Sequence, residues 1–373
     1  MIKLNIFGDF KSSDVTKLSI ETSLQDIIDD SDINCLNFEA PLKEEGSSPI
    51  EKSGPSITND DKAPEWLLKH GFNLFSLANN HICDYGGDSL TKTMNAFPEG
   101  KTVGAGSWEE AYSFRILEKD GVKIAFIAVT HHEFGVLYEE SYQRDEKGSA
   151  WMLHPCIDEL IIEAKQQCDY CFILPHCGME HEYFPLPEIR TLYHHWVNIG
   201  ADGIFASHPH TAQPWEDYKG HPIAYSLGNF CFESLWNTPP KYWYKSIIAS
   251  VTIDDGKISM EMQHCGYDET CGKLSIINDN QFAEHLNQIN NILQNHKDYI
   301  KAIDAQCAKY KDMYDAFANE SGYYRMSPNF VFKLGKRVAK MLLGRMNING
   351  TASLMNILRC ETHRWTLTRI LSL

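Results

Sequence analysis

Patterns typical of strands and helices alternate along most of the chain, and this alternation constrains the fold more than any other feature. Apolar runs predict strands over 33–39 and 171–176, and an amphipathic run predicts a helix over 61–71. Alternating strands and helices are typical of an α/β core. Antiparallel hairpins are predicted at 113–129 and 247–263, because each run turns at an Asp-Gly pair. We therefore predict an α/β fold with mixed sheets.

The character of the sequence changes near residue 275, which predicts three regions. Residues 1–275 carry the alternating pattern, residues 276–320 resemble a long helical extension, and residues 321–373 form a basic tail. The tail has nine basic residues and one acidic residue, whereas the whole chain has a formal charge of −16. An acidic body repels phosphate, so nucleic-acid binding is not expected.

Within the tail, residues 330–346 have the pattern of a basic amphipathic helix. Such a helix can lie on an anionic membrane surface, but it can equally pack on the body or on a partner, and the sequence leaves both alternatives open. The first residues have the pattern of a strand rather than that of a signal peptide. No apolar run approaches the roughly 20 residues that span a bilayer. We therefore expect a cytoplasmic protein, with peripheral contact to the inner face of the cell membrane as one option.

The eleven cysteines have no spacing typical of a disulfide framework, which fits a reducing compartment. One pair, Cys168 and Cys171, has the CxxC spacing of redox motifs. A redox cysteine needs a site that lowers its pKa, such as a helix N-terminus. This pair instead lies between the end of a predicted helix and the start of a strand. We therefore expect both cysteines to be structural.

Polar side chains with metal-binding chemistry gather where the predicted strands end. In open α/β sheets, ligands bind at the carboxyl ends of the strands. Carboxylate, amide and imidazole groups together are typical of a transition-metal site, and this set exceeds what one tetrahedral ion requires. Each residue alone could be a turn, cap or core residue, so the joint pattern carries the prediction. The residues are Asp9, Asn37, Glu39, Asn79, Asn80, His81, Asp84, His176, Glu180, His208 and His210.

Other histidines provide a contrast to this set. His194 and His195 lie in the middle of a predicted helix, away from the strand ends, and we expect them to be structural. His131 and His132 follow a predicted strand, so they could line the same cleft or belong to the core.

Six short motifs follow one another in the body of the chain. They are GD at 8–9, NFEAPL at 37–42, LANNHICDYG at 77–86, HCGMEH at 176–181, ASHPH at 206–210 and YSLGNF at 225–230. Their order resembles the CapA family, also called the poly-gamma-glutamate capsule-synthesis family, a branch of the calcineurin-like metallophosphoesterase superfamily. The resemblance extends from about residue 2 to residue 232. It implies a layered α/β–β/α sandwich with mixed sheets, followed here by a helical C-terminal extension.

The resemblance also implies roles for the matching residues. His81 would protonate the leaving group, Asp84 would orient His81, and Glu39 would occupy the position of a bridging aspartate. One or two divalent transition metals (Mn, Fe or Zn) are implied. Their ligands would be Asp9, Glu39, Asn80, His176, His208 and His210. Two residues depart from the superfamily pattern, since Lys11 replaces a histidine ligand and Glu39 is longer than aspartate.

Two functions follow from these observations. The first is a metal-dependent hydrolase that acts on a phosphoester, or on an acyl or amide centre, in the synthesis of a capsule or other surface polymer. The second is a non-catalytic capsule-assembly or polymer-binding factor with a degenerate metal site, working with a polymer-synthase complex. Aromatic side chains could stack on sugars or simply pack in the core; they are Trp215, Trp236, Tyr242, Trp243 and Tyr244.

Overall fold

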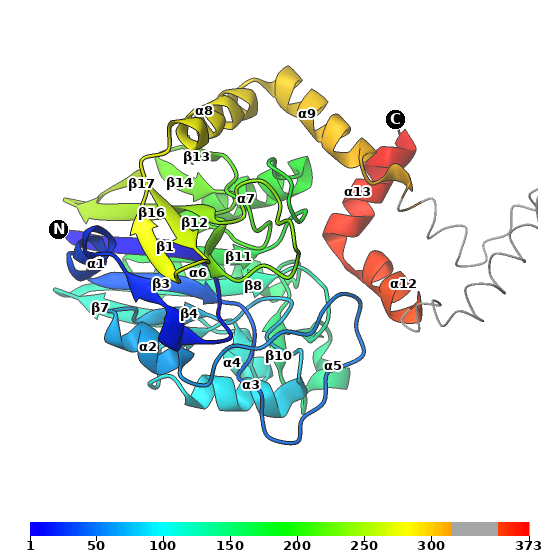
Figure 1. Cartoon of the computed structure of the whole chain (residues 1–373), viewed down its shortest axis with the longest axis horizontal. Coiled ribbons are helices and arrows are strands. Elements are labelled where there is room, and N and C mark those ends of the chain that lie inside the picture. The colour runs from blue at the N-terminus through cyan, green and yellow to red at the C-terminus, as the bar shows by residue number, and fades with distance from the viewer. Residues whose placement is uncertain (313, 315–349, 373) are drawn as a thin grey trace, which may run out of the picture.

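Two large β-sheets form the centre of the computed structural model, which describes residues 1–312, 314 and 350–372 (Figure 1). In the first, nine-stranded sheet, β15 (Asn229–Phe232) pairs with β1 outside the linear order. The order of the other strands is β2 (Ser19–Ile20), β18 (Lys273–Ile276), β17 (Lys257–Asp268), β16 (Lys245–Asp254), β1 (Ile2–Lys11), β3 (Ile33–Phe38), β4 (Leu74–Ser76) and β5 (Thr102–Val103).

The second sheet has six strands, and a short three-stranded sheet lies apart from it. The six-stranded order is β13 (Trp215–Tyr218), β14 (His221–Ala224), β12 (Gly203–Phe205), β11 (Tyr170–His176), β8 (Val122–Thr130) and β7 (Arg115–Lys119). The small sheet is β6 (Ala105–Gly106), β10 (Gly148–Ala150) and β9 (Val136–Leu137). Both large sheets mix parallel and antiparallel pairs, as predicted.

Helices cover the outer faces of the two sheets, so the body has four layers. Apolar residues of α1 (Thr22–Asp29), α2 (Ala63–Lys69) and α3 (Gly86–Asn95) share one core cluster with the first sheet. Those of α6 (Cys156–Gln167) and α7 (Pro187–Ile199) pack with the second sheet. Short helices complete the body: η1 (Val15–Lys17), α4 (Trp108–Ala111) and α5 (Glu140–Gln143).

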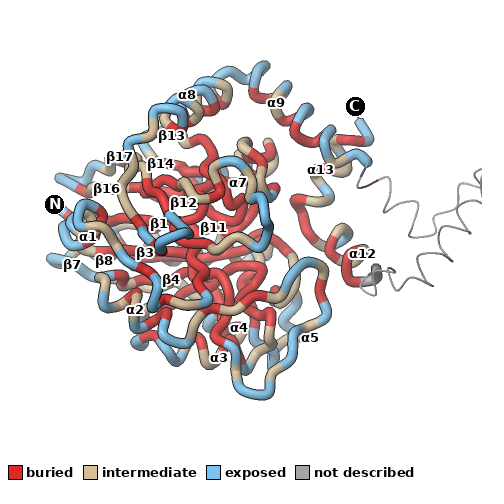
Figure 2. The backbone as a smooth tube through the Cα atoms, viewed as in Figure 1, coloured by how far each residue is buried: buried red, intermediate tan, exposed pale blue. Residues whose placement is uncertain are grey.

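Strand β1 shows how the sequence produces this layering. It is buried along almost its whole length, because one face meets helices and the other meets the second sheet (Figure 2). Neighbouring side chains on a strand point to opposite faces. Accordingly, Ile6 belongs to the core between the sheets and Phe7 to the core beneath the helices. The predicted layered α/β–β/α sandwich is confirmed.

The C-terminal helices continue the core, because their buried apolar residues share one cluster with the second sheet. The run expected to be one long helix is divided into α8 (Asn280–Gln294) and α9 (His296–Ala308). Asn295 separates them, because its extended backbone ends α8 and its side chain accepts hydrogen bonds from the first amides of α9. The next described helices are α12 (Gly350–Arg359) and α13 (Glu361–Ser372), and α13 lies beside α9 (Figure 1).

The sequence led to two expectations about membranes, one about spanning helices and one about a basic amphipathic helix. In the part of the chain that the structure describes, no helix has the length and apolar character needed to cross a bilayer. The predicted basic amphipathic helix at 330–346 lies outside the described residues, so it stays a prediction.

Gly8 allows β1 to approach the loop before β15, and this contact yields a stability prediction. A Cβ atom at Gly8 would lie 1.8 Å from the carbonyl oxygen of Gly228, which itself has a positive φ of 75°. We expect Gly8→Ala to destabilise the protein by about 3 kcal/mol, because backbone on both sides must move. Urea unfolding measures the change. Gly87→Ala is the control, since its Cβ would meet Lys147 at an ordinary 3.4 Å, and equal stability of the two variants would contradict the prediction.

Candidate metal centre

The carboxyl ends of strands from both sheets meet at one buried site. Asp9 on β1 and Asn37 on β3 are register partners in a parallel pair, and Glu39 follows Asn37 by two residues. From the second sheet, His176 ends β11, and His208 lies in the loop after β12. Parallel strands place their carboxyl ends at the same edge of a sheet, and for this reason residues that are distant in sequence lie close together here.

The first group of ligand atoms comes from Asp9, Glu39 and His210, whose nearest donor atoms all lie within 4.8 Å of one another. His210 Nε2 lies 3.5 Å from Glu39 Oε1, and His210 Nδ1 lies 3.5 Å from Asp9 Oδ2. The amide oxygen of Asn229 accepts a hydrogen bond from His210 Nδ1 at 2.9 Å. Because Nδ1 donates this bond, Nε2 is the ring nitrogen that faces Glu39, and it could bind a metal once it has lost its proton.

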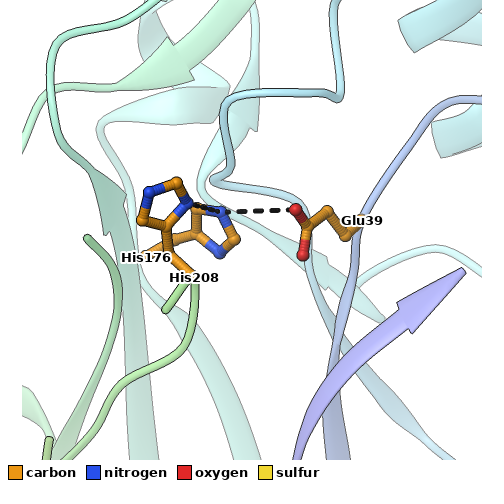
Figure 3. Close-up of side chains that lie close together, drawn as sticks. All are labelled: Glu39, His176 and His208. Carbon is orange, nitrogen blue, oxygen red and sulfur yellow. Dashed lines mark hydrogen bonds and ion pairs between the residues drawn. The ribbon is translucent and has the colours of Figure 1, made fainter. Parts of the chain in front are cut away.

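The second group comes from Glu39, His176 and His208 (Figure 3). His176 Nε2 lies 3.0 Å from His208 Nδ1 and 3.8 Å from Glu39 Oε1. It also lies 3.0 Å from the amide oxygen of Asn80. Two atoms bound to one ion at roughly 2.1 Å and at right angles are about 3.0 Å apart, so these spacings fit a shared cation.

Glu39 belongs to both groups, and its environment tests whether cations fit the site. The side chain is fully buried, and in the part of the chain that the structure describes its Oε1 atom has no hydrogen-bond partner. Burial, together with the neighbouring charge of Asp9, raises the pKa of the Glu39 carboxyl well above its usual value. A cation would satisfy a buried carboxylate oxygen of this kind, so the residues present fit divalent metals.

The histidines differ in charge for a related reason. Burial lowers the pKa of both His176 and His208 well below the usual value, which keeps them neutral. Neutral imidazole is the form that binds metals. Burial also opposes protonation of His210, but the carboxylates of Glu39 and Asp9 outweigh it and raise the pKa of His210 to about 10. Positive charge is therefore favoured between Asp9 and Glu39, whether a proton or a metal supplies it.

Backbone strain accompanies the two loop histidines. His208 has φ of 100° and His210 has φ of 55°, and both values lie in the left-handed region that favours glycine. The amide of His208 donates a hydrogen bond to Asp9 Oδ2 at 3.2 Å, which helps to hold this loop. Strained residues of this kind cluster at functional sites, where surrounding contacts fix them.

Lys11 does not take the place of the missing histidine ligand. Its ammonium group forms an ion pair with Glu233 at 2.7 Å. The first group therefore contains Asp9, Glu39 and His210, whereas the second has Glu39, His176 and His208 with the Asn80 oxygen beside them.

The predicted pair of His81 and Asp84 lies beside the second group, in hydrogen-bond contact. His81 Nδ1 lies 2.7 Å from Asp84 Oδ2, so the carboxylate fixes the orientation of the ring. Asp84 is completely buried, accepts a hydrogen bond from the Ile57 amide at 2.8 Å and pairs with the ammonium group of Lys52. Lys52 Nζ also lies 3.1 Å from His81 Nδ1.

A pocket of about 290 Å³ opens beside these residues. Its inner wall includes Asn80, His81 and His208, and its outer wall includes Tyr314 and His363 from the C-terminal region. Glu180, one of the strand-end residues, is exposed and also borders this pocket. In the described part of the chain, the five aromatic residues proposed to stack on sugars are not among its lining residues. Trp243, for example, is buried and packs against the His210 ring.

The structure places the other histidines and the CxxC cysteines of the sequence analysis either at the pocket or away from it. His131 lines the pocket, with its ring centroid 4.4 Å from that of His208. His194 and His195 lie on α7 and contact acidic residues away from the centre, namely Glu216 and Asp158. Burial raises the pKa of both thiols of the CxxC pair, to about 12 for Cys171, which agrees with a structural role.

Sequence reasoning missed two residues that support the centre. Glu133 accepts a hydrogen bond from the Asn80 amide nitrogen at 3.0 Å, which turns the Asn80 oxygen toward His176. It follows strand β8 by three residues, so the strand-end rule that found the others could have found it. Lys52 lies in a loop without a recognisable pattern, and no signal in the sequence pointed to it.

The fold is a sandwich of two mixed sheets, and carboxylate, amide and imidazole groups gather at its strand ends. The family model described as bacterial capsule synthesis protein PGA_cap matches residues 7–234. The chain belongs to this family.

Curated relatives agree with the family assignment. The chain is 30% identical to a capsule biosynthesis protein CapA of Bacillus anthracis, over 54% of this chain and 50% of that protein. It is also 30% identical to a PGA biosynthesis protein CapA of Bacillus subtilis, over 58% of each. The chain thus spans about half the length of these relatives. A solved structure of a putative 5′-nucleotidase from Staphylococcus aureus has a TM-score of 0.45 and 14% identity, covering 78% of this chain and 58% of that one.

Proposed function

We propose that this chain is a divalent-metal-dependent hydrolase of the phosphoesterase type, acting in the synthesis of capsule, poly-gamma-glutamate or another surface polymer. The position of Glu39 carries the hydrolase part, because one buried, unpartnered carboxylate oxygen faces both ligand groups. The names of the curated relatives support the polymer context. Substrate, polymer-synthase partners and peripheral contact with the inner face of the membrane are parts of the same proposal.

The chain's own residues would divide the work of hydrolysis. Divalent ions in this position polarise a phosphoryl or acyl oxygen and favour a hydroxide nucleophile at neutral pH. Asp9, Glu39 and His210 would hold one ion, and Glu39, His176, His208 and Asn80 the other. His81 would give a proton from Nε2 to the leaving group, since Asp84 occupies its Nδ1 side. The pocket would place the substrate between His81 and the ligand groups.

Metal analysis of the full chain, purified without chelators, tests this proposal. We expect bound Mn, Fe or Zn and turnover of aryl phosphates or γ-glutamyl compounds in the presence of Mn²⁺. Asn80→Ala should lower metal affinity roughly 10- to 100-fold, because it removes an oxygen beside His176. A metal-free protein that hydrolyses none of these substrates with added Mn²⁺ would contradict the proposal.

A second candidate function is a non-catalytic capsule-assembly or polymer-binding factor. The position of Lys11 favours it, because the ion pair with Glu233 leaves three residues in the first ligand group. Under this alternative at most one bound ion per chain would depend on Glu39, no substrate would be turned over, and the protein would co-purify with membrane partners.

A further inference from the structure

We propose that His131, Glu133 and Cys360 form an additional cation site, separate from the two ligand groups around Glu39, that binds a thiophilic divalent ion such as Zn²⁺. The three residues come from distant parts of the chain. His131 and Glu133 follow strand β8, whereas Cys360 joins α12 to α13. One donor atom from each lies within 4.8 Å of the other two.

Cys360 and Glu133 contact the two different ring nitrogens of His131, the first within hydrogen-bond distance for sulfur and the second beyond hydrogen-bond distance. Cys360 Sγ lies 3.5 Å from His131 Nδ1, and His131 Nε2 lies 3.6 Å from Glu133 Oε1. The second distance is too long for a hydrogen bond. Zinc sites in proteins combine the same donors, which are imidazole nitrogen, carboxylate oxygen and thiolate sulfur.

Two buried polar atoms without hydrogen-bond partners point to a ligand here. His131 is 1% exposed, and its Nε2 has no hydrogen-bond partner among the described residues. Asn356 on α12 is 9% exposed, and its Oδ1 likewise has none, while its Nδ2 lies 3.5 Å from Glu133 Oε1. Leaving such atoms unsatisfied in the protein interior is unfavourable. A cation bound by the Nε2 lone pair would satisfy the His131 nitrogen.

The hydrogen bonds around the cluster keep its donors available. Thr362 Oγ1 lies 3.3 Å from His131 Nδ1, so a proton on Nδ1 has an acceptor and Nε2 keeps its lone pair. Glu133 Oε2 accepts the hydrogen bond from Asn80, while Glu133 Oε1 accepts a long hydrogen bond from Asn356 Nδ2 and lies 3.6 Å from His131 Nε2. On binding, the Cys360 thiol would lose its proton to solvent and coordinate as thiolate.

The site lies where the C-terminal helices meet the body, which suggests what it does. Glu361, beside Cys360, accepts a hydrogen bond from the His132 amide at 2.8 Å and another from the Trp151 indole. These contacts and the proposed ion would hold α12 and α13 as the outer wall of the pocket. The ion would then be structural, and its ligands would tie the wall to Asn80 through Glu133.

Cobalt(II) titration of the metal-depleted full chain tests the proposal, because thiolate coordination gives cobalt a near-ultraviolet absorption that oxygen and nitrogen ligands do not. We expect the band at saturation to correspond to one thiolate-bound ion per chain in the wild-type protein and to be lost in Cys360→Ser. His131→Gln, a second variant, should weaken it at least 10-fold in affinity. Zinc content should fall by one ion per chain in Cys360→Ser.

Two controls separate this site from the rest of the protein. Glu39→Gln, which alters both other ligand groups, should keep the band, so failure of the proposed hydrolase function leaves this test unaffected. Cys271→Ser removes an exposed thiol and should also keep the band. Absence of the band from the folded wild-type protein, or its persistence in Cys360→Ser, would overturn the proposal.

Discussion

Glu39→Gln is expected to remove most of the bound metal and to lower hydrolysis on the order of 1,000-fold. The substitution keeps the size of the side chain but removes the negative charge that both ligand groups share. Losing an interaction worth several kcal/mol in the transition state corresponds to roughly this factor. Elemental analysis measures the metal content, and steady-state hydrolysis of an aryl phosphate measures the rate.

Glu45→Gln provides the matched control, because Glu45 is an exposed carboxylate in the loop that follows Glu39. It should change neither metal content nor rate. The thermal midpoint should also respond to added Mn²⁺ in the wild-type protein and in Glu45→Gln, but hardly in Glu39→Gln, since ligands stabilise the state that binds them. Unchanged metal content in a folded Glu39→Gln variant would show that Glu39 does not bridge the two groups.

His81→Ala is expected to have the second-largest effect, and the effect should depend on the leaving group. Protonation by a positioned side chain contributes roughly 10²- to 10⁴-fold to a rate. We therefore expect a loss of about 1,000-fold for an alkyl phosphate, whose leaving alkoxide needs a proton. The loss should be only about 10-fold for 4-nitrophenyl phosphate, whose leaving phenolate is stable without one.

The comparison requires a variant that removes a histidine without touching the pocket. His195→Ala serves this purpose, because His195 is half-exposed on α7 and contacts Asp158. Metal content should stay at the wild-type level in both variants. Equal losses for the two substrates in His81→Ala would exclude His81 as the proton donor and would point instead to a role in holding Asp84 and Lys52.

Much of the centre could be predicted because strand patterns carry directional information. The last side chains of parallel strands lie at the carboxyl edge of the sheet. Asp9, Glu39 and His176 could therefore be grouped from the sequence alone. The same reasoning separated His194 and His195, which lie within a helix. The division between α8 and α9 was missed, because a single capping asparagine does not interrupt the apolar pattern.

Local periodicity in the sequence determined the α/β class with mixed sheets and the residues that gather at the strand ends, and the family resemblance added the layered sandwich. Only the tertiary structure decided that Lys52 supports Asp84, that Glu133 turns Asn80, and that the C-terminal helices form a wall of the pocket. These contacts join segments separated by 32, 53 and more than 200 residues. Local patterns cannot encode them, because they arise only when buried polar groups find partners in the packed chain.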